Sequence, residues 1–521
     1  MTATTDAPVR HLPPRATWAA PLSVARMLRL ELRRNAMPWI LPLIAALFWF
    51  DSYRPSAATP PIWVLRTFWN MGQGHTIIDF GPFVAGVAAW MGSRDGRRGT
   101  ADLVTATPRP RYAAQLATWA ATAIWAMGAY LAFVGVVFAV YAHEGVHGSP
   151  PWWWVAVGAT SVTAFSAAGF TIGALYRSRF AAALAAFGGF LVMTMSSQTG
   201  FSHTSGWALI LPTNSNGNYQ PVSGNFYPYL PDLPIARVIF LAGITVVALS
   251  LLGLPAGAGG PLLRRVAAAV GLAGLAVTGT AIGLAATARL EPHGMAIAAL
   301  HDAANDRPIP YTPVCSHETG IPVCLNPAYD SIMANVASAL RPVLAEVAGL
   351  PGAPARAAQV GGAYSSNEGE AGQAMTISGH PPVLRMPLDA EDLPGMFGGS
   401  VTGFTEQLQL LVVHAFAGAG SGAGTPAQQA VQAVLLEGAG VPFAAQPKVL
   451  AGVGLPSWAQ ATLAAAAAAR PGPTDGPGPA TGPVYAAARR LAALSPAARH
   501  AWLASHLAAL RAGRLTLAQL P

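Results

Sequence analysis

The sequence predicts an α-helical polytopic membrane protein with about seven spans, followed by a mixed α/β domain outside the cytoplasm. Three observations predict this class. Of the 521 residues, 53% are hydrophobic and 10% are charged, whereas a soluble domain is about 25% charged. The apolar residues form runs of helical length before residue 290, and basic residues lie between these runs. The residues after 290 contain both cysteines and many turn-forming Gly and Pro, as expected of a folded domain.

The net charge of +8 is unevenly distributed along the chain. Residues 1–289 contain 19 basic and 8 acidic side chains, whereas residues 290–521 contain 11 basic and 14 acidic ones. The positive charge therefore flanks the apolar runs, where it favours contact with a lipid bilayer. The sequence has no basic patch interleaved with aromatic residues, so it predicts no nucleic-acid partner.

Residues 94–111 determine the orientation of the predicted spans. This stretch lies between two apolar runs and contains five arginines, each of which costs roughly 2.5–3.5 kcal/mol at the centre of a membrane helix. It is therefore predicted to be a loop at the membrane surface, and its positive charge favours the cytoplasmic side. With alternating spans, 15 basic residues before residue 290 fall in cytoplasmic segments and four fall outside, as the positive-inside rule predicts.

The first 35 residues are predicted to be a cytoplasmic tail and an interfacial helix. Residues 1–21 are polar and proline-rich, and residues 21–35 interleave leucines with four arginines. A basic amphipathic helix of this kind lies along the cytoplasmic leaflet; the alternative is a lead-in to the first span. We expect no cleavable signal peptide, because the first apolar run begins at Met37 and leads into further spans.

Six spans are predicted within residues 36–258 and a seventh within residues 259–289. A helix needs about 17–25 residues to cross a bilayer, so the first span, which is short, is expected to extend to Ala36 and to Ser52–Tyr53. Trp152, Trp153 and Trp154 precede the fourth span and are typical of a membrane interface. The expected spans are residues 37–50, 76–92, 113–141, 155–176, 180–196, 235–254 and 266–286.

Residues 198–234, between the fifth and sixth spans, are too polar to cross the membrane and too apolar for an ordinary loop. An apolar run from Trp207 to Leu211 precedes a polar stretch and several aromatic residues. We therefore predict a re-entrant or interfacial element that is buried within the protein.

Residues 290–521 are predicted to form the extracytoplasmic domain. Cys315 and Cys324 enclose a short segment with Gly and Pro, which favours a disulfide in an oxidising compartment; two free thiols are the alternative. Ser495-Pro496 is typical of a helix start. Helices are predicted near residues 329–350, 405–417, 426–436 and 457–469, strands near residues 359–360 and 375–377, and a flexible linker at residues 471–483.

Two sequence patterns bear on catalysis. A P-loop requires Gly-x-x-x-x-Gly-Lys followed by Ser or Thr, but the sole lysine, Lys448, lies between Pro447 and Val449. The chain therefore has no P-loop of its own. Residues 143–147 match the zinc-protease pattern His-Glu-x-x-His, yet Gly145 interrupts the helix that this site requires. We interpret this segment as the polar end of the third span and predict no metal site.

These features resemble the permease subunits of type-two ATP-binding-cassette (ABC) exporters. The shared features are the interfacial helix at residues 21–35, six spans, a charged loop between the second and third spans, and a re-entrant element between the fifth and sixth. Residues 97–111 resemble the loop whose coupling helix docks on the ATPase subunit. The resemblance covers about residues 21–258, so the seventh span and the outer domain lie outside it.

The resemblance implies a complex of two permeases, identical or homologous, with two ABC ATPase subunits in a bacterial plasma membrane. The chain itself would bind no cofactor, and ATP and Mg would bind to the ATPase. The residues expected to couple the loop to the ATPase are Arg94, Arg97, Arg98, Gly99, Thr100, Asp102, Leu103, Val104, Thr107 and Pro108.

The cargo expected from the resemblance is a hydrophobic or amphipathic small molecule or peptide, as in multidrug efflux. A route lined by Met and aromatic side chains suits such a cargo. Asp79 is included because an ionisable residue at span depth is a functional candidate, although a position in the headgroup layer is the alternative that the sequence favours. The residues expected along the route are Phe48, Trp49, Asp79, Phe83, Met193 and Met195.

Two other functions remain open from the sequence. The chain could be a membrane-anchored enzyme, with a zinc or degenerate peptidase-like outer domain, or a sensor whose outer domain binds a ligand. The sequence lacks a convincing catalytic constellation, which disfavours the enzyme. It also lacks a cytoplasmic output domain, which disfavours the sensor.

Overall fold

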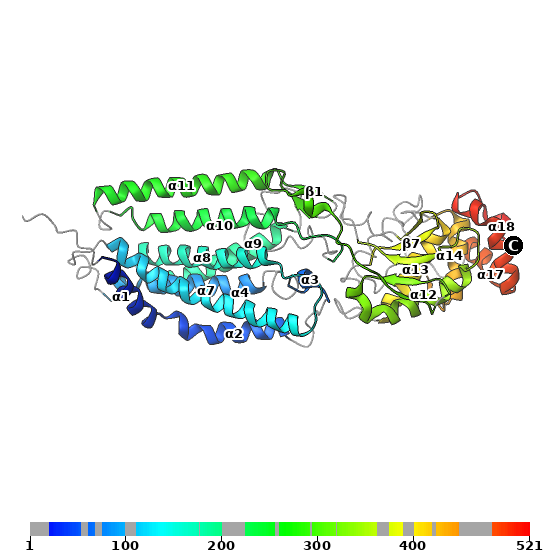
Figure 1. Cartoon of the computed structure of the whole chain (residues 1–521), viewed down its shortest axis with the longest axis horizontal. Coiled ribbons are helices and arrows are strands. Elements are labelled where there is room, and N and C mark those ends of the chain that lie inside the picture. Colours follow the sequence, from blue (N-terminus) through cyan, green and yellow to red (C-terminus); the bar gives the residue numbers. More distant parts are fainter. Residues whose placement is uncertain are drawn as a thin grey trace, which may run out of the picture.

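The computed structural model has a bundle of long helices and, at one end of it, a smaller domain that contains a sheet (Figure 1). The bundle is built from the first part of the chain, and helix α11 leads into the C-terminal domain. The structure describes residues 20–53, 61–67, 75–98, 111–176, 178–200, 225–255, 260–291, 294–318, 320–361, 375–388, 401–418, 424–446 and 482–521.

Four helices in the described part of the chain are long and apolar enough to cross a membrane. They are α7 (Arg111–His143), α8 (Trp152–Leu175), α10 (Asp232–Leu251) and α11 (Pro261–Ala286). Shorter apolar helical segments occur at Met37–Leu47, Phe80–Gly92 and Ala181–Met195. These helices indicate a membrane protein. The expected number of about seven spans is not confirmed, because three of the expected spans correspond to these shorter segments.

The bundle contains further helices in addition to these four. A short helix, α3, lies between the first two expected spans. The bounds are α1 (Ala20–Arg33), α2 (Met37–Tyr53), α3 (Trp63–Thr67), α4 (His75–Gly92), α5 (Arg94–Arg97) and α9 (Ala181–Gly200).

Small residues bring the central helices α4 and α8 into backbone contact. A Cβ atom built on Gly169 would lie 2.2 Å from the Ala85 carbonyl oxygen, and one on Gly173 would lie 2.0 Å from the Ala89 carbonyl oxygen. The two glycines and the two alanines each recur at a spacing of four, which is the small-residue pattern of membrane helix pairs. The backbones of α4 and α8 therefore approach each other closely at these positions.

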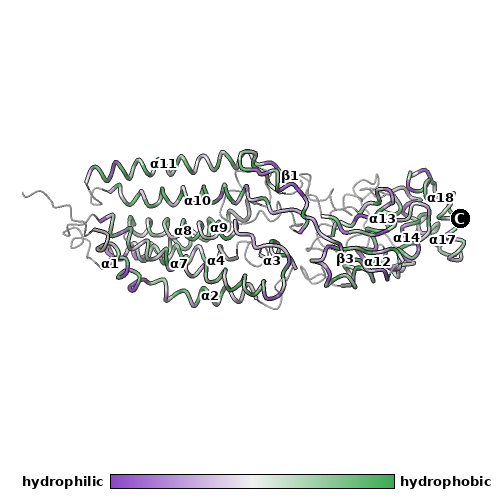
Figure 2. Tube along the Cα trace, viewed as in Figure 1, coloured by the Kyte–Doolittle hydropathy of each residue, from purple (hydrophilic) through white to green (hydrophobic). Residues whose placement is uncertain are grey.

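Large apolar side chains cover the outside of the bundle. Leu262 and Leu272 on α11 are 74% and 67% exposed, and Phe187 on α9 is 61% exposed. Figure 2 shows hydrophobic residues, in green, along most of the length of these helices. An apolar exterior of this extent fits contact with lipid, since soluble proteins rarely expose contiguous patches of more than a few hundred Å².

The C-terminal domain contains a mixed sheet with the order β3-β4-β5-β7-β6. The β4–β5 and β5–β7 pairs are parallel and the two edge pairs are antiparallel. A separate hairpin, β1–β2, follows α11. The strands are β1 (Arg289–Glu291), β2 (Gly294–Ala296), β3 (Val314–Ser316), β4 (Val323–Leu325), β5 (Arg356–Gln359), β6 (Thr376–Ser378) and β7 (Val383–Met386).

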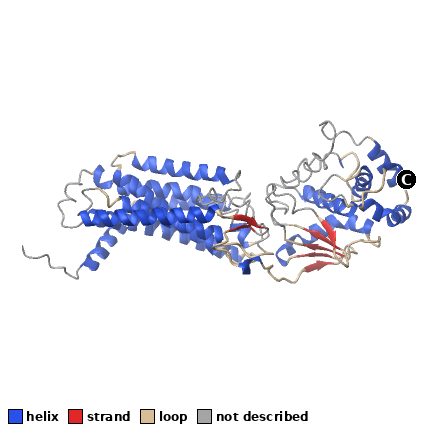
Figure 3. Ribbon diagram, turned by 90° about the horizontal axis from the view of Figure 1, so that it is seen from above, coloured by secondary structure: helices blue, strands red, loops and turns tan. Residues whose placement is uncertain are grey.

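Helices cover one face of this sheet (Figure 3). α12 packs on β3 and β4, and α13 packs on α12 and β6, so the crossover from β4 through α12 returns to the parallel strand β5. Val336, Leu340 and Leu344 of α12 are fully buried in the core. The helices are α12 (Met333–Val347), α13 (Val401–Ala417), α14 (Pro426–Gly438), α17 (Pro483–Ala492) and α18 (Pro496–Arg511), with 3₁₀ turns at Ala303–Asp306, Pro327–Ile332 and Leu517–Gln519.

Several predictions for this domain have clear outcomes. Cys315 and Cys324 are opposite one another on β3 and β4 and form the expected disulfide. Ser495 caps α18 by accepting a hydrogen bond from the Ala498 backbone N–H. The predicted helix at residues 457–469 lies outside the described residues, as do nearly all of the predicted linker and most of the predicted re-entrant element at residues 198–234.

Candidate functional site

The end of the bundle that lies away from the C-terminal domain contains α1 and the first turn of α11 (Figure 1). The first turn of α7 also lies there, because α7 packs against α1. This end collects most of the positive charge of the helical part. The basic residues described in and just after α1, in and just after α5, just before α9 and at the starts of α7 and α11 are Arg26, Arg29, Arg33, Arg34, Arg94, Arg97, Arg98, Arg111, Arg179, Arg264 and Arg265.

α5 is a single helical turn that follows directly on α4. The Ser93 backbone N–H donates to the Ala89 carbonyl oxygen at 2.9 Å, and the Arg97 backbone N–H donates to the Ser93 carbonyl oxygen at 3.0 Å. Ser93 Oγ also donates to the Trp90 carbonyl oxygen at 3.2 Å. These bonds carry the chain from α4 into α5 without a break, so a displacement of α5 is passed to α4.

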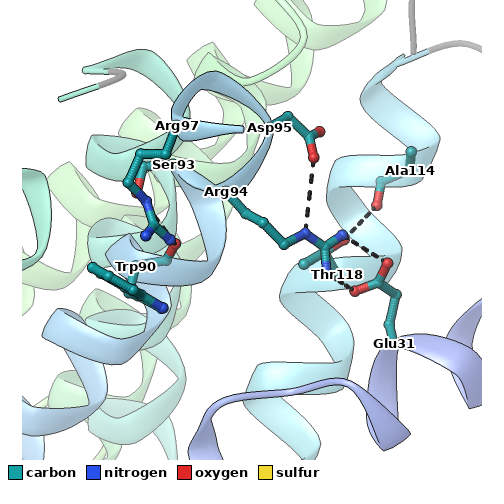
Figure 4. Close-up of polar contacts among 8 residues, drawn as sticks. All are labelled: Glu31, Trp90, Ser93, Arg94, Asp95, Arg97, Ala114 and Thr118. Atoms are coloured by element: carbon teal, nitrogen blue, oxygen red, sulfur yellow. Dashed lines mark hydrogen bonds and ion pairs between the residues drawn. The ribbon is translucent and has the colours of Figure 1, made fainter. Parts of the chain in front are cut away.

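Glu31 of α1 and Arg94 of α5 form a bidentate ion pair (Figure 4). Arg94 Nη1 lies 2.9 Å from Glu31 Oε2, and Nη2 lies 2.8 Å from Oε1. Both side chains are mostly shielded, at 20% and 17% exposed. The hydrogen bonds to Glu31 raise the pKa of the Arg94 guanidinium. Charge-assisted pairs with this geometry are among the strongest polar contacts in proteins, so the pair fastens α5 to α1.

Arg97 folds back onto the end of α4. Its guanidinium carbon lies 3.3 Å from the centre of the Trp90 ring, and Nη2 donates to the Trp90 carbonyl oxygen at 2.7 Å. Nε donates to Ser93 Oγ at 3.1 Å. A cation at this position is favourable because the carbonyl groups at a helix C-terminus carry partial negative charge. Partial burial lowers the pKa of the Arg97 guanidinium.

α1 is held against α7 by side chains that bond to the backbone and to each other. Trp125 Nε1 donates to the Leu32 carbonyl oxygen at 2.9 Å. Asn35 is 3% exposed, donates to Thr122 Oγ1 and accepts from the Met37 backbone N–H, each at 2.9 Å. This attachment turns the basic residues of the α1 segment outward. The exposed ones are Arg26, Arg29, Arg33 and Arg34.

The structure describes three of the ten residues predicted to couple the loop to an ATPase. Arg94 and Arg97 use their side chains within the chain, whereas Arg98 is exposed. Arg94 and Arg97 are therefore positioning residues that set α5 against α1 and α4. The other seven lie outside the described residues: Gly99, Thr100, Asp102, Leu103, Val104, Thr107 and Pro108.

Glu31 is the residue of this site that the sequence analysis missed. It is the one acidic residue between Asp6 and Asp51, within a helix that otherwise carries arginines. A lone carboxylate in a basic interfacial helix has no favourable contact with an anionic leaflet. That mismatch was a signal for a buried cationic partner, although the partner's identity depends on the fold.

The residues predicted for a cargo route do not share one surface. Trp49 and Met195 are 52% and 59% exposed, whereas Met193 is fully buried. Phe83 is half-buried against the cluster that contains Phe80 and Val84. The two methionines differ in exposure because residues two positions apart on a helix face different sides. The side chains of Phe48 and Asp79 lie outside the described residues.

At the opposite end of the bundle, the zinc-protease pattern has a structural role. α7 ends at His143, so the two histidines do not share a helical face. Glu144 forms an ion pair with Arg66 of α3, whose guanidinium carbon lies 4.7 Å from the centre of the Tyr141 ring. The His147 backbone bonds to both Pro61 and Trp63. The segment thus fastens the α3 region to the end of α7.

A second cluster joins α10 to the C-terminal part of the chain. Asp232 is fully buried, and its Oδ2 accepts from the Ile297 backbone N–H at 2.8 Å. His301 Nδ1 lies 3.1 Å from the same oxygen, and Nε2 lies 3.2 Å from Asp306 Oδ2. Hydrogen bonds to Asp306 and then to Asp232 raise the pKa of His301. The charged imidazole can donate to both carboxylates, so this cluster is tightest when His301 is protonated.

Within the described residues, no group of three or more His, Cys, Asp or Glu side chains is arranged to hold a metal ion. The arginine-rich end offers positive charge, a continuous α4–α5 connection and an ion pair to α1. That arrangement suits the transmission of a mechanical displacement.

No protein-family model, curated protein or solved structure matches the chain.

Proposed function

We propose that the chain is the membrane-spanning permease subunit of an ABC exporter, driven by a separate ATPase that docks at the α5 end of the bundle. In this proposal the chain has about seven spans and lies in the bacterial plasma membrane. The N-terminus and α5 face the cytoplasm and the C-terminal domain faces outside. The cargo is a hydrophobic or amphipathic molecule, and a second permease copy or homologue completes the complex.

The observation that carries the proposal is the Glu31–Arg94 pair, which ties α5 to α1. A docking loop can drive a transporter only if its displacement reaches the spans. Through Glu31 that displacement reaches α1, and through Ser93 it reaches α4. α1 in turn contacts α7 through Trp125.

The packing of α4 extends this connection into the bundle. α4 lies backbone to backbone against α8 at Gly169 and Gly173, and α8 packs against α10. Closely packed helices transmit displacement as rigid bodies because their interfaces do not deform continuously. A push on α5 is therefore expected to tilt a group of helices rather than bend one loop.

The test begins with purification of the full chain, in mild detergent, from membranes of its own cells. An ATPase should copurify, and its ATP hydrolysis should rise when the pair is reconstituted in lipid with amphipathic compounds. Glu31→Gln removes one side of the ion pair while keeping the size of the side chain. We expect this variant to retain the ATPase but to lose most of the compound-stimulated hydrolysis.

Glu318→Gln is the matched control, because Glu318 also pairs with an arginine, Arg341, at 2.8 Å but lies in the C-terminal domain. The control should behave as the unmodified chain. The proposal is wrong if the purified chain neither retains nor stimulates any ATPase. It is also wrong if Glu31→Gln and Glu318→Gln have the same effect on stimulated hydrolysis.

A further inference from the structure

The sheet of the C-terminal domain has a second face, opposite the helices, that opens into a cavity of about 890 Å³. Cys324, Ala358 and Arg385 are successive partners across β4, β5 and β7 and share this face. Their neighbours Ala357 and Leu384 point to the opposite face and are fully buried in the core. Side chains alternate along a strand, so Arg356, Ala358 and Arg385 face the cavity from strand positions opposite to those that fill the core.

Two arginines, Arg356 and Arg385, line this cavity. Arg356 and Arg385 both face it from adjacent parallel strands, and none of its lining residues in the described part of the chain is Asp or Glu. Neither arginine forms an ion pair or side-chain hydrogen bond with a described residue. From strand spacing, their Cα atoms lie on a diagonal of about 8 Å. Two long side chains at this separation can reach one shared anion.

The walls of the cavity are held in place by their own contacts. Tyr311 Oη donates to the Gln359 carbonyl oxygen at 3.3 Å, and the Tyr311 ring lies edge-on to Phe226 at 5.5 Å. Burial raises the pKa of the Tyr311 hydroxyl, and the charge of Arg356 opposes that shift. On the other side, the Pro382 carbonyl oxygen in the β6–β7 turn accepts from the Ala355 backbone N–H at 2.7 Å. A preformed concave site of this kind is typical of small-molecule binding.

The rest of the lining combines apolar surface with a few polar groups. Pro313, Val360 and Val383 supply the apolar surface, and Ser378 and His380 add hydrogen-bonding groups. The volume lies within the range of about 300–1,000 Å³ that ligand sites usually have. The lining therefore suits a molecule with one anionic group and a small apolar body.

We propose that this cavity is a binding site for an organic anion, whose phosphate or carboxylate group is held between Arg356 and Arg385 while its apolar part contacts the proline and valine side chains. Guanidinium groups bind both kinds of anion through paired hydrogen bonds. The anion relieves the repulsion between the two arginines. The site does not depend on the proposed transport function, because every residue that lines it belongs to the C-terminal domain.

The test uses the full chain in neutral detergent with its disulfide intact, and hexyl phosphate as the probe. Isothermal titration should show saturable binding of hexyl phosphate, weaker binding of inorganic phosphate and none of hexanol. Arg356→Gln and Arg385→Gln should each weaken the binding of hexyl phosphate roughly tenfold or more, since each removes a charge-assisted contact. The double variant should abolish it.

Arg514→Gln is the matched control, because Arg514 is an exposed arginine of the same domain outside the cavity. It should leave the affinity unchanged. The proposal is overturned if hexyl phosphate does not bind to the unmodified chain, if hexanol binds equally well, or if binding survives in the double variant.

A lipid headgroup and a soluble metabolite could both supply the anion, and a second measurement separates these sources. The titration is repeated in nanodiscs of neutral lipid, with and without phosphatidic acid. If the anionic lipid weakens the apparent affinity for hexyl phosphate, the site takes a headgroup. If the affinity is unchanged, the site takes a soluble anion. Either result supports the site and assigns its source.

Discussion

The helical bundle exposes many large apolar side chains on its outer surface, whereas the C-terminal domain buries most of its apolar side chains in a core. Large hydrophobic residues that are exposed occur along the bundle, and among the described residues after 286 they are confined to Ile309, Tyr311 and Val314. In the C-terminal domain, the apolar residues instead fill one extended core. The bundle core is divided into smaller clusters, several of which contain alanines.

This difference is expected if the C-terminal domain is surrounded by water and the bundle by lipid. In water, burial of apolar surface drives packing, so the C-terminal domain hides its leucines and valines. In lipid there is no such drive between helices, and close contact of small residues holds them together instead. The comparison predicts that the same kind of substitution will have different effects in the two regions. The following experiments test this, from the largest expected effect to the smallest.

Truncation of a buried leucine should have the largest effect. Leu340→Ala removes a fully buried side chain from α12 and should lower the free energy of unfolding of the C-terminal domain by about 3–4 kcal/mol. Hydrogen exchange of peptides from α12, measured in the full chain, reports this change. Leu272→Ala on α11, where the side chain is 67% exposed, is the control and should change stability by less than about 0.5 kcal/mol. Equal effects at the two positions would contradict the comparison.

A small increase in size should be costly in the bundle. Gly173→Ala places a Cβ atom 2.0 Å from the Ala89 carbonyl oxygen, so α4 and α8 must separate. We expect a loss of about 3 kcal/mol, measured by detergent-induced unfolding. Gly279→Ala on α11 is the control, because no atom lies within 4 Å of the added Cβ. If both variants unfold alike, backbone contact does not hold α4 to α8.

Loss of the disulfide should affect the C-terminal domain alone. Cys315 and Cys324 are nine residues apart in sequence, and a bridge that closes a loop of this size stabilises by about 2.5 kcal/mol in the chain-entropy model. Replacement of both with serine should accelerate hydrogen exchange in β3 and β4. Exchange in α7 and α8 should be unchanged, and a change there would mean that the two regions unfold together.

The smallest effect is a pH dependence at the junction of the two regions. Because the pKa of His301 is raised in the folded chain, its contribution to stability is present below the unfolded pKa of about 6.5 and is lost as the pH rises through the raised folded value. His301→Ala should therefore reduce the unfolding midpoint more at pH 5.5 than at pH 8.5. His506→Ala is the control, since no carboxylate bonds to His506 among the described residues. If the effect of His301→Ala does not change with pH, the contacts of His301 with Asp232 and Asp306 do not stabilise the fold.

Residues of the proposed sites show how far sequence reasoning reaches. The arginines of α5 were identifiable because arginine between apolar runs is costly in lipid. Glu31, the partner of Arg94, was not identifiable in this way, because it lies 63 residues away in the sequence on another helix. Likewise, nothing in the sequence links Arg356 with Arg385. They lie on the same face of the sheet because β5 and β7 pair in parallel, although residues 360–382 separate the two strands in the sequence.

The sequence by itself determined the local features of this protein. Apolar runs and helix caps predicted most of the helices, including α7, α8, α10, α11 and α18, and cysteine spacing predicted the disulfide. These features depend on hydrophobicity and on contacts between residues close in sequence. The tertiary structure alone decided which helix faces meet, why Gly169 and Gly173 must be small, and which side chains gather into the ion pair and the cavity. Such contacts depend on packing between residues that are far apart in the sequence, and a pattern along the sequence does not specify which distant residues meet.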